Sequence, residues 1–148
     1  MRIRPSEFDS AALWLEPILS EVRSRKLVAV TGPIGAGKST LSRFLAWYFN
    51  VSLIEADYYL VPNKGFECAP EEVNRIVAQR HNIQRSVIVE GAAIFPLLAS
   101  IGRVPDAIIQ VRNSSDSRRP TVDEVRVLSP VVWGFDSCPT YEMVVAHG

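Results

Sequence analysis

The sequence predicts an α/β fold in which helices wrap a parallel sheet. Short apolar runs alternate with amphipathic stretches, and the connections between them are short. The run at residues 27–30 is continuously apolar, which is typical of a strand covered on both faces. A glycine-rich loop follows it and opens directly into an amphipathic stretch at residues 39–49. Together these observations predict right-handed strand–helix–strand units.

The remaining strands continue this alternation after an N-terminal helical segment at residues 1–25. In that segment we expect one helix or two short ones, with Pro17 as a point where the helix could break or restart. Asn50 is expected to end the helix that follows the glycine-rich loop. Further strands are expected at residues 51–54, 86–89, 106–111 and 141–146.

Two more helices complete the pattern, one after Pro70 and one at residues 92–101, where Pro96 interrupts it. The apolar stripe of the first consists of Val73, Ile76, Val77 and Ile83. A chain of 148 residues can bury roughly two thirds of its unfolded surface around one core. We therefore expect residues 1–148 to form a single domain.

Charge and cysteine content restrict the partners and the compartment. Sixteen basic and sixteen acidic residues cancel, so no overall field attracts nucleic acid or an anionic membrane. Cys68 and Cys138 match no zinc or redox spacing and are too few for a secreted disulfide scaffold. The N-terminus carries no apolar stretch long enough for a signal peptide or a membrane span. We expect a cytoplasmic protein without nucleic-acid or membrane partners.

The glycine-rich loop matches the spacing G-x-x-x-x-G-K-[ST] between a strand and a helix. Its glycines let backbone N–H groups turn toward phosphate oxygens, and the helix N-terminus adds a positive dipole end. Lys38 should reach the β- and γ-phosphates of ATP, and Ser39 should offer its hydroxyl to Mg²⁺. Thr40 lies near the α-phosphate or only on the helix face. The expected nucleotide-binding residues are Gly32, Pro33, Gly35, Ala36, Gly37, Lys38, Ser39 and Thr40.

Two acidic residues follow strands whose ends converge on this loop. Asp57 could accept a proton from a substrate hydroxyl or hold Mg²⁺ through water, or it is a solvated loop residue. Glu55 is a weaker competitor for the same role. Glu90, at the end of the third strand, could be a second-shell magnesium ligand, or it pairs with an arginine or caps a helix. The expected metal set is Ser39, Asp57 and Glu90.

Residues 113–140 are rich in Ser, Pro, Arg and Asp, which predicts a mobile, lid-like segment or a surface excursion. Its arginines Arg118 and Arg119 could close over a transferring phosphate, although surface arginines are common in polar loops. Trp133 and Phe135 could pack in the core or form a wall for a ligand. The loop motif, the acids and this arginine pair give the expected catalytic set: Lys38, Asp57, Glu90, Arg118 and Arg119.

Over residues 27–111 the chain resembles the uridine kinase, phosphoribulokinase and pantothenate kinase group of P-loop small-molecule kinases. The resemblance lies in Gly-Pro-Ile-Gly-Ala-Gly-Lys-Ser-Thr, in Asp-Tyr-Tyr after the second strand and in Val-Ile-Val-Glu-Gly at the third. It implies a three-layer P-loop NTPase fold with five parallel strands in the order 2-3-1-4-5. It also implies that Asp57 is the catalytic carboxylate, that Glu90 lies near metal and substrate, and that Arg118 or Arg119 is the lid arginine.

These observations favour an ATP- and magnesium-dependent kinase that phosphorylates a hydroxyl of a small metabolite. The acceptor is nucleoside-like, sugar-like or pantothenate-like. Members of this group that bind nucleosides usually have a longer insertion between the Asp element and the third strand, whereas here only residues 58–85 separate the two. The difference favours a small or differently held acceptor, or a chain that has lost the activity. The alternatives are a P-loop ATPase or switch, and a nucleotide-binding protein without turnover.

Overall fold

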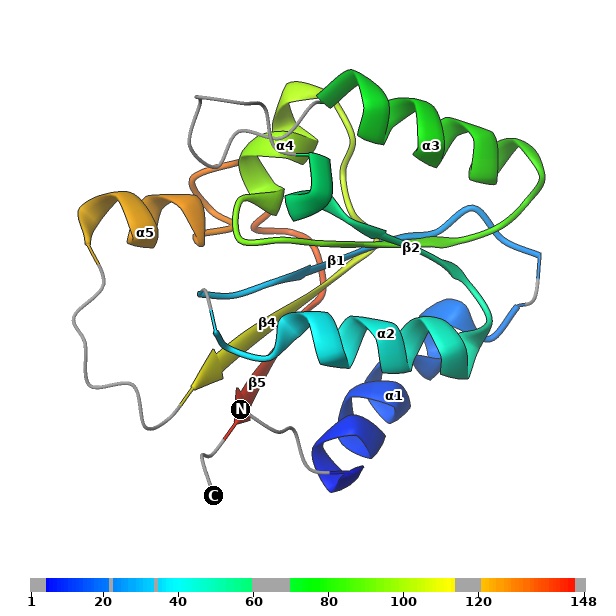
Figure 1. The fold of residues 1–148 in the computed structure, drawn as a ribbon, viewed down its shortest axis with the longest axis horizontal. Helices are drawn as coiled ribbons and strands as arrows, with labels where there is room; N and C mark the ends of the chain where they lie inside the picture. Colours follow the sequence, from blue (N-terminus) through cyan, green and yellow to red (C-terminus); the bar gives the residue numbers. More distant parts are fainter. Residues whose placement is uncertain (1–4, 22, 34, 60–69, 114–120, 146–148) are drawn as a thin grey trace.

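The computed structural model describes residues 5–21, 23–33, 35–59, 70–113 and 121–145. Within these ranges the chain forms a five-stranded sheet whose neighbouring strands are all parallel, in the order β2-β3-β1-β4-β5 (Figure 1). This confirms the predicted α/β class and strand order. The strands are β1 (Leu27–Thr31), β2 (Ser52–Glu55), β3 (Val87–Glu90), β4 (Ala107–Asn113) and β5 (Thr140–Val145).

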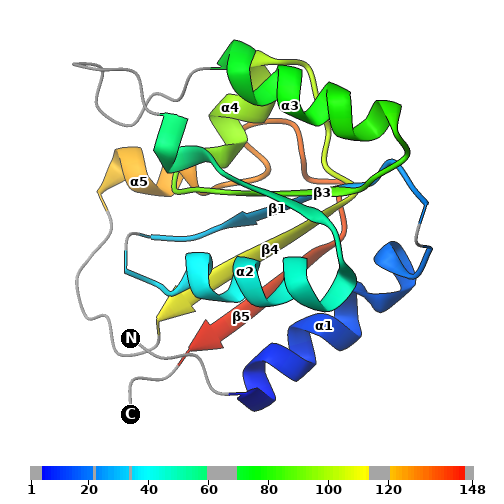
Figure 2. The ribbon, with the colours of Figure 1, turned by 45° about the vertical axis from the view of Figure 1, so that its right-hand side comes forward.

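Helices cover both faces of the sheet and make the fold three-layered. Helices α1 and α2 lie on one face, and α3 and α4 lie on the other (Figures 1 and 2). None of the helices in the described ranges is long and apolar enough to cross a membrane. The helices are α1 (Pro5–Leu19), α2 (Lys38–Phe49), α3 (Pro70–Asn82), α4 (Ile94–Ser100) and α5 (Val122–Val127), with a short 3₁₀ helix, η1 (Ala56–Tyr59).

The central strand β1 divides the apolar core into two layers. Val28 and Val30 pack with the α1 and α2 side of the core, and Ala29 packs with the α3 and α4 side. Every residue of β1 is buried because the strand has a neighbour on each edge and helices on each face. This explains why its sequence is a continuous apolar run rather than an alternating one.

Helix α1 is a single helix, which was one of the two predicted alternatives, whereas some other predicted boundaries were wrong. Helix α1 continues through Pro17, which lies on an exposed face of the last turn, where water can satisfy the freed carbonyl group. The helix ends at Leu19 instead of continuing to residue 25. Pro96 lies in the first turn of α4, where its missing N–H costs no helical hydrogen bond, so it does not interrupt that helix. Ile83 follows the end of α3 and is exposed, so it is not part of the buried stripe.

Residues 113–140 contain more regular structure than the sequence predicts. Thr121 caps α5 by accepting a hydrogen bond from the Glu124 N–H at 3.1 Å. The polar composition of the segment predicts a loop and does not take this N-cap residue into account. After the helix, Phe135 is buried, and its ring centroid lies 5.8 Å from that of Phe95 in α4. Trp133 packs against the same cluster and donates its indole N–H to the Arg126 carbonyl at 2.9 Å. Phe135 is therefore a core residue, and Trp133 is partly buried against the same cluster.

Phe135→Ala should lower the free energy of unfolding by about 3–5 kcal/mol, because it leaves a cavity beside Phe95. Urea denaturation followed by circular dichroism measures this change. Val122→Ala is the matched control, since Val122 is 85% exposed and its truncation should change the unfolding free energy by less than about 0.5 kcal/mol. A loss below about 1 kcal/mol for Phe135→Ala would contradict its placement in the core.

Candidate functional site

The loop between β1 and α2 has the backbone of an anion cradle. Gly35 and Gly37 have φ of 82° and 90°, in the left-handed region that favours glycine. The Ala36 N–H donates to the Pro33 carbonyl at 3.1 Å and tightens the loop. Gly37 is the N-cap of α2 and makes no side-chain capping bond, so the first-turn amides are left for a ligand.

Gly32 is required by packing as well as by the loop. A Cβ added at this residue would lie 2.3 Å from the carbonyl oxygen of Val111 in β4, which no side chain tolerates. The absence of a side chain therefore lets the chain leave β1 directly beside β4. This reason is tertiary, and the motif alone does not contain it.

Lys38 extends back along the loop that precedes it. Its side chain comes from the first residue of α2, is only 6% exposed, and donates from Nζ to the Pro33 carbonyl at 3.4 Å. Ser42 donates its hydroxyl to the Lys38 carbonyl at 2.7 Å and anchors this turn of the helix. Among the described residues, no carboxylate lies within ion-pair distance of Lys38 Nζ. The ammonium group is thus held near the cradle.

Glu90 is a nearly fully buried carboxyl group at the end of β3. It is 1% exposed, and its Oε1 atom has no hydrogen-bond partner in the described part of the chain. Burial raises the pKa of Glu90, and the negative charges of Asp57 and Glu55 add to this, while Lys38 and a hydrogen bond from the Ser39 side chain oppose it. Neither an arginine pair nor a helix cap is found for Glu90 among these residues.

Asp57 lies in η1, directly after β2, and is exposed. Its Oδ1 atom is 3.2 Å from the point that a Cβ on Gly91 would occupy. Gly91 follows Glu90 in the chain, so Asp57 lies against the backbone that carries the buried acid. Its exposure leaves the carboxylate open to a small molecule in solution.

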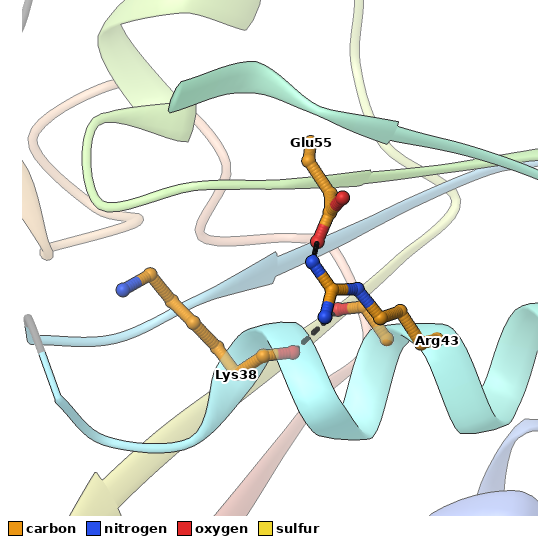
Figure 3. Close-up of polar contacts among 4 residues, drawn as sticks. Lys38, Arg43 and Glu55 are labelled. Atoms are coloured by element: carbon orange, nitrogen blue, oxygen red, sulfur yellow. Dashed lines mark hydrogen bonds and ion pairs between the residues drawn. The ribbon is translucent and has the colours of Figure 1, made fainter. Parts of the chain in front are cut away.

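Glu55, the weaker candidate, is engaged elsewhere. Arg43 of α2 forms an ion pair with it, with 2.8 Å between Arg43 Nη2 and Glu55 Oε1 (Figure 3). This contact joins α2 to the end of β2, and both side chains lie to the right of Lys38 in the view of Figure 3. Glu55 therefore holds the helix to the sheet, a role that the sequence did not reveal.

The oxygen atoms available at this edge fit magnesium better than a metal with an all-protein ligand set. The described residues contain no group of three or more His, Cys, Asp or Glu side chains that could hold a metal. Mg²⁺ usually takes one or two carboxylates together with phosphate oxygens and water. The hydroxyl of Ser39, the unpartnered Glu90 Oε1 and the exposed Asp57 carboxylate are donors of this kind.

The other predicted residues lie apart from this group or outside the described ranges. Arg118 and Arg119 fall outside them, so their role stays a prediction. Thr40 is exposed in the first turn of α2. Thr31, whose buried hydroxyl bonds to the Gly91 carbonyl, was not among the predicted residues. Its only signal in the sequence is that a hydroxyl residue ends an otherwise apolar strand.

Comparison with solved structures supports the fold. A sugar kinase from Janibacter sp. HTCC2649, in an unliganded structure, superposes with a TM-score of 0.52 at 15% identity, over 80% of this chain and 84% of that one. The fold is that of the P-loop NTPases. At this level of identity the similarity extends to the fold alone and does not single out the uridine kinase group.

Two further solved structures superpose with lower TM-scores. A putative kinase from Chloroflexus aurantiacus has a TM-score of 0.42 at 17% identity, over 85% of this chain and 87% of that one. FlhF in complex with GMPPNP and Mg²⁺ has a TM-score of 0.41 at 14% identity, over 93% of this chain and 73% of that one. No family model and no curated sequence matches the chain.

Glu90→Gln should raise the melting temperature at neutral pH, because it removes a buried carboxyl group that is costly to ionise. Since the folded pKa is raised, the folded protein keeps this proton at pH values where the unfolded chain has released it. The contribution of Glu90 to the free energy of unfolding is therefore fully present below the ordinary pKa of 4.5. It is lost as the pH rises through the pKa that Glu90 has in the folded protein.

Thermal melts of both proteins from about pH 4 to pH 8 test this, with the gain growing as the pH rises. Glu16→Gln is the control, because Glu16 is exposed on α1 and should show no such trend. A Glu90→Gln protein that melts below the wild type at neutral pH would contradict the assignment.

Proposed function

We propose that this protein is an ATP- and Mg²⁺-dependent kinase that transfers the γ-phosphoryl group to a hydroxyl of a small metabolite. The observation that carries the proposal is the gathering of Lys38, Ser39, Asp57 and Glu90 at one edge of the sheet, beside the N-terminus of α2. These residues come from three separate elements. A glycine-rich turn with only a structural role would not need two acids and a buried lysine beside it.

Each residue has a role in phosphoryl transfer. The amides of the loop and Lys38 bind the β- and γ-phosphates, and Asp57 accepts the proton of the acceptor hydroxyl as its oxygen bonds to the γ-phosphorus. The bond from that phosphorus to the bridging oxygen breaks, and ADP leaves. Ser39, Asp57 and Glu90 are the residues that would hold Mg²⁺, which neutralises charge on the phosphates. Arg118 and Arg119 are proposed to add positive charge from the lid-like segment.

The chemical class of the acceptor is a small hydroxyl compound that is nucleoside-like, sugar-like or pantothenate-like. A P-loop ATPase is the second candidate, because Asp57 is exposed and could orient water in place of an acceptor. We place either activity in a single cytoplasmic domain that acts on small molecules rather than on nucleic acid or membranes. Equal ATP consumption with and without a pool of hydroxyl compounds would favour the ATPase.

Lys38→Ala should abolish ATP binding, because it removes the buried ammonium group that the structure holds beside the cradle. Fluorescence titration with a labelled ATP analogue and Mg²⁺ measures the loss, which should be at least about 100-fold in Kd. Lys26→Ala is the control, since the Lys26 side chain is exposed just before β1. Near-normal affinity in Lys38→Ala would refute the cradle.

Asp57→Asn should keep ATP binding and lose phosphoryl transfer, because the amide cannot accept the acceptor's proton. A fall in kcat of about 10²–10⁴-fold is expected for loss of a general base. Transfer of labelled phosphate from ATP to a panel of small hydroxyl compounds measures it, with Asp9→Asn on the exposed face of α1 as the control. Full activity in Asp57→Asn would remove Asp57 from the mechanism.

A further inference from the structure

Thr31 is the one polar residue of the buried strand β1. It lies directly before the glycine-rich loop, residues 32–39, which is the phosphate loop of the proposed function. Its side chain is completely buried. The Thr31 hydroxyl donates to the carbonyl oxygen of Gly91 at 2.9 Å. A buried hydroxyl needs a partner of this kind, and the partner here belongs to the residue that follows Glu90.

Gly91 is held on both sides by the end of β1. Its N–H donates to the Val30 carbonyl at 3.2 Å, which continues the strand ladder between β1 and β3. Its carbonyl oxygen accepts from Thr31, a side-chain bond outside that ladder. The two bonds together fix the orientation of the Gly91 peptide relative to the strand that leads into the phosphate loop.

Gly91 also determines where Asp57 can lie. A Cβ at Gly91 would be 3.2 Å from Asp57 Oδ1 and 3.3 Å from the Cβ of Ala56. Both distances are tighter than ordinary contacts, so Asp57 and the start of η1 occupy the space that the missing side chain leaves. The position of the Gly91 backbone is therefore transmitted to Asp57 on one side and to Glu90, its chain neighbour, on the other.

We propose that Thr31 is a positioning residue for phosphoryl transfer. Through its bond to Gly91 it fixes the positions of Asp57 and Glu90 relative to the phosphate loop. This inference rests on the kinase function proposed above. The mechanism makes no other use of Thr31, because its hydroxyl faces Gly91 and not the cradle. A reacting group displaced by about 1 Å can lose about 100-fold in rate, so one buried bond at this junction can have a large effect on kcat.

The same geometry explains why the bond would not affect nucleotide binding to the same extent. The loop amides, Gly37 and Lys38 belong to the segment after Gly32, and their conformation depends on contacts within the loop and on α2. The Thr31 bond connects this segment to the two acids. Losing it should leave the cradle formed and misplace the acids.

Thr31→Val tests the proposal, because valine has nearly the shape of threonine and replaces its hydroxyl with a methyl group. We expect kcat to fall by about 10–100-fold while the Kd for the labelled ATP analogue stays within about threefold of the wild type. Thr31→Ser, which keeps the hydroxyl, should recover kcat to within about threefold. Activities are normalised to the folded fraction measured by circular dichroism.

Gly91→Ala is an independent variant that leaves Thr31 intact. Its methyl group would crowd Asp57 Oδ1 and Ala56, so it should also lower kcat and spare nucleotide binding. This variant reports on the same junction if Thr31→Val does not fold. A result in which Gly91→Ala keeps wild-type kcat would overturn the inference.

The outcomes separate this inference from the proposed function. If the wild type binds ATP but phosphorylates no acceptor, the kinase function fails, and the positioning role fails with it. If the wild type is active and Thr31→Val retains its kcat, only the positioning role of Thr31 is wrong. If Thr31→Val and Thr31→Ser lose activity equally, or if Kd rises as much as kcat falls, Thr31 supports the whole loop, and the inference is overturned.

Discussion

The whole site depends on the central strand β1, which pairs with β3 on one edge and with β4 on the other. Because all the strands are parallel, their carboxyl ends meet at one edge of the sheet, and the chain leaves β1 there between its two neighbours. On the β4 side the absence of a side chain at Gly32 permits contact with Val111. On the β3 side the hydroxyl of Thr31 holds Gly91. The phosphate loop is thus fastened to both neighbours of β1.

At this edge of the sheet, some interactions oppose the ionisation of Glu90 and others favour it. Burial and two neighbouring carboxylates oppose ionisation of Glu90, while Lys38 and Ser39 favour it. The uncapped N-terminus of α2 adds a positive dipole end close to the same group. An unpartnered, nearly fully buried carboxylate oxygen is expensive in a protein that has only a structural use for it. Under the proposed function, this oxygen would have a use when Mg²⁺ and phosphates are bound.

Sequence patterns predicted the elements well where local and tertiary signals agree. The fully buried β1 and the loop with helix α2 were predicted almost to the residue, and Asn50 does end α2 in a left-handed conformation. Prediction failed where packing overrides local tendency. Residues 113–140 have a polar composition, yet Thr121 caps a helix and Phe135 reaches the core beside Phe95. The sequence cannot reveal that contact, because the two aromatics lie on segments far apart in the chain.

The sequence by itself determined the fold class, the phosphate loop and the two acids that follow neighbouring strands, because these depend on residue order and strand direction. Only the tertiary structure decided the surroundings of each acid. Glu55 is held by Arg43, Glu90 is buried beside Lys38 and Asp57 is left exposed. These differences arise from the depth of each side chain and from partners on other elements. The same is true of Thr31, because its hydroxyl bonds to the Gly91 carbonyl oxygen, at 2.9 Å, only when β3 lies beside β1.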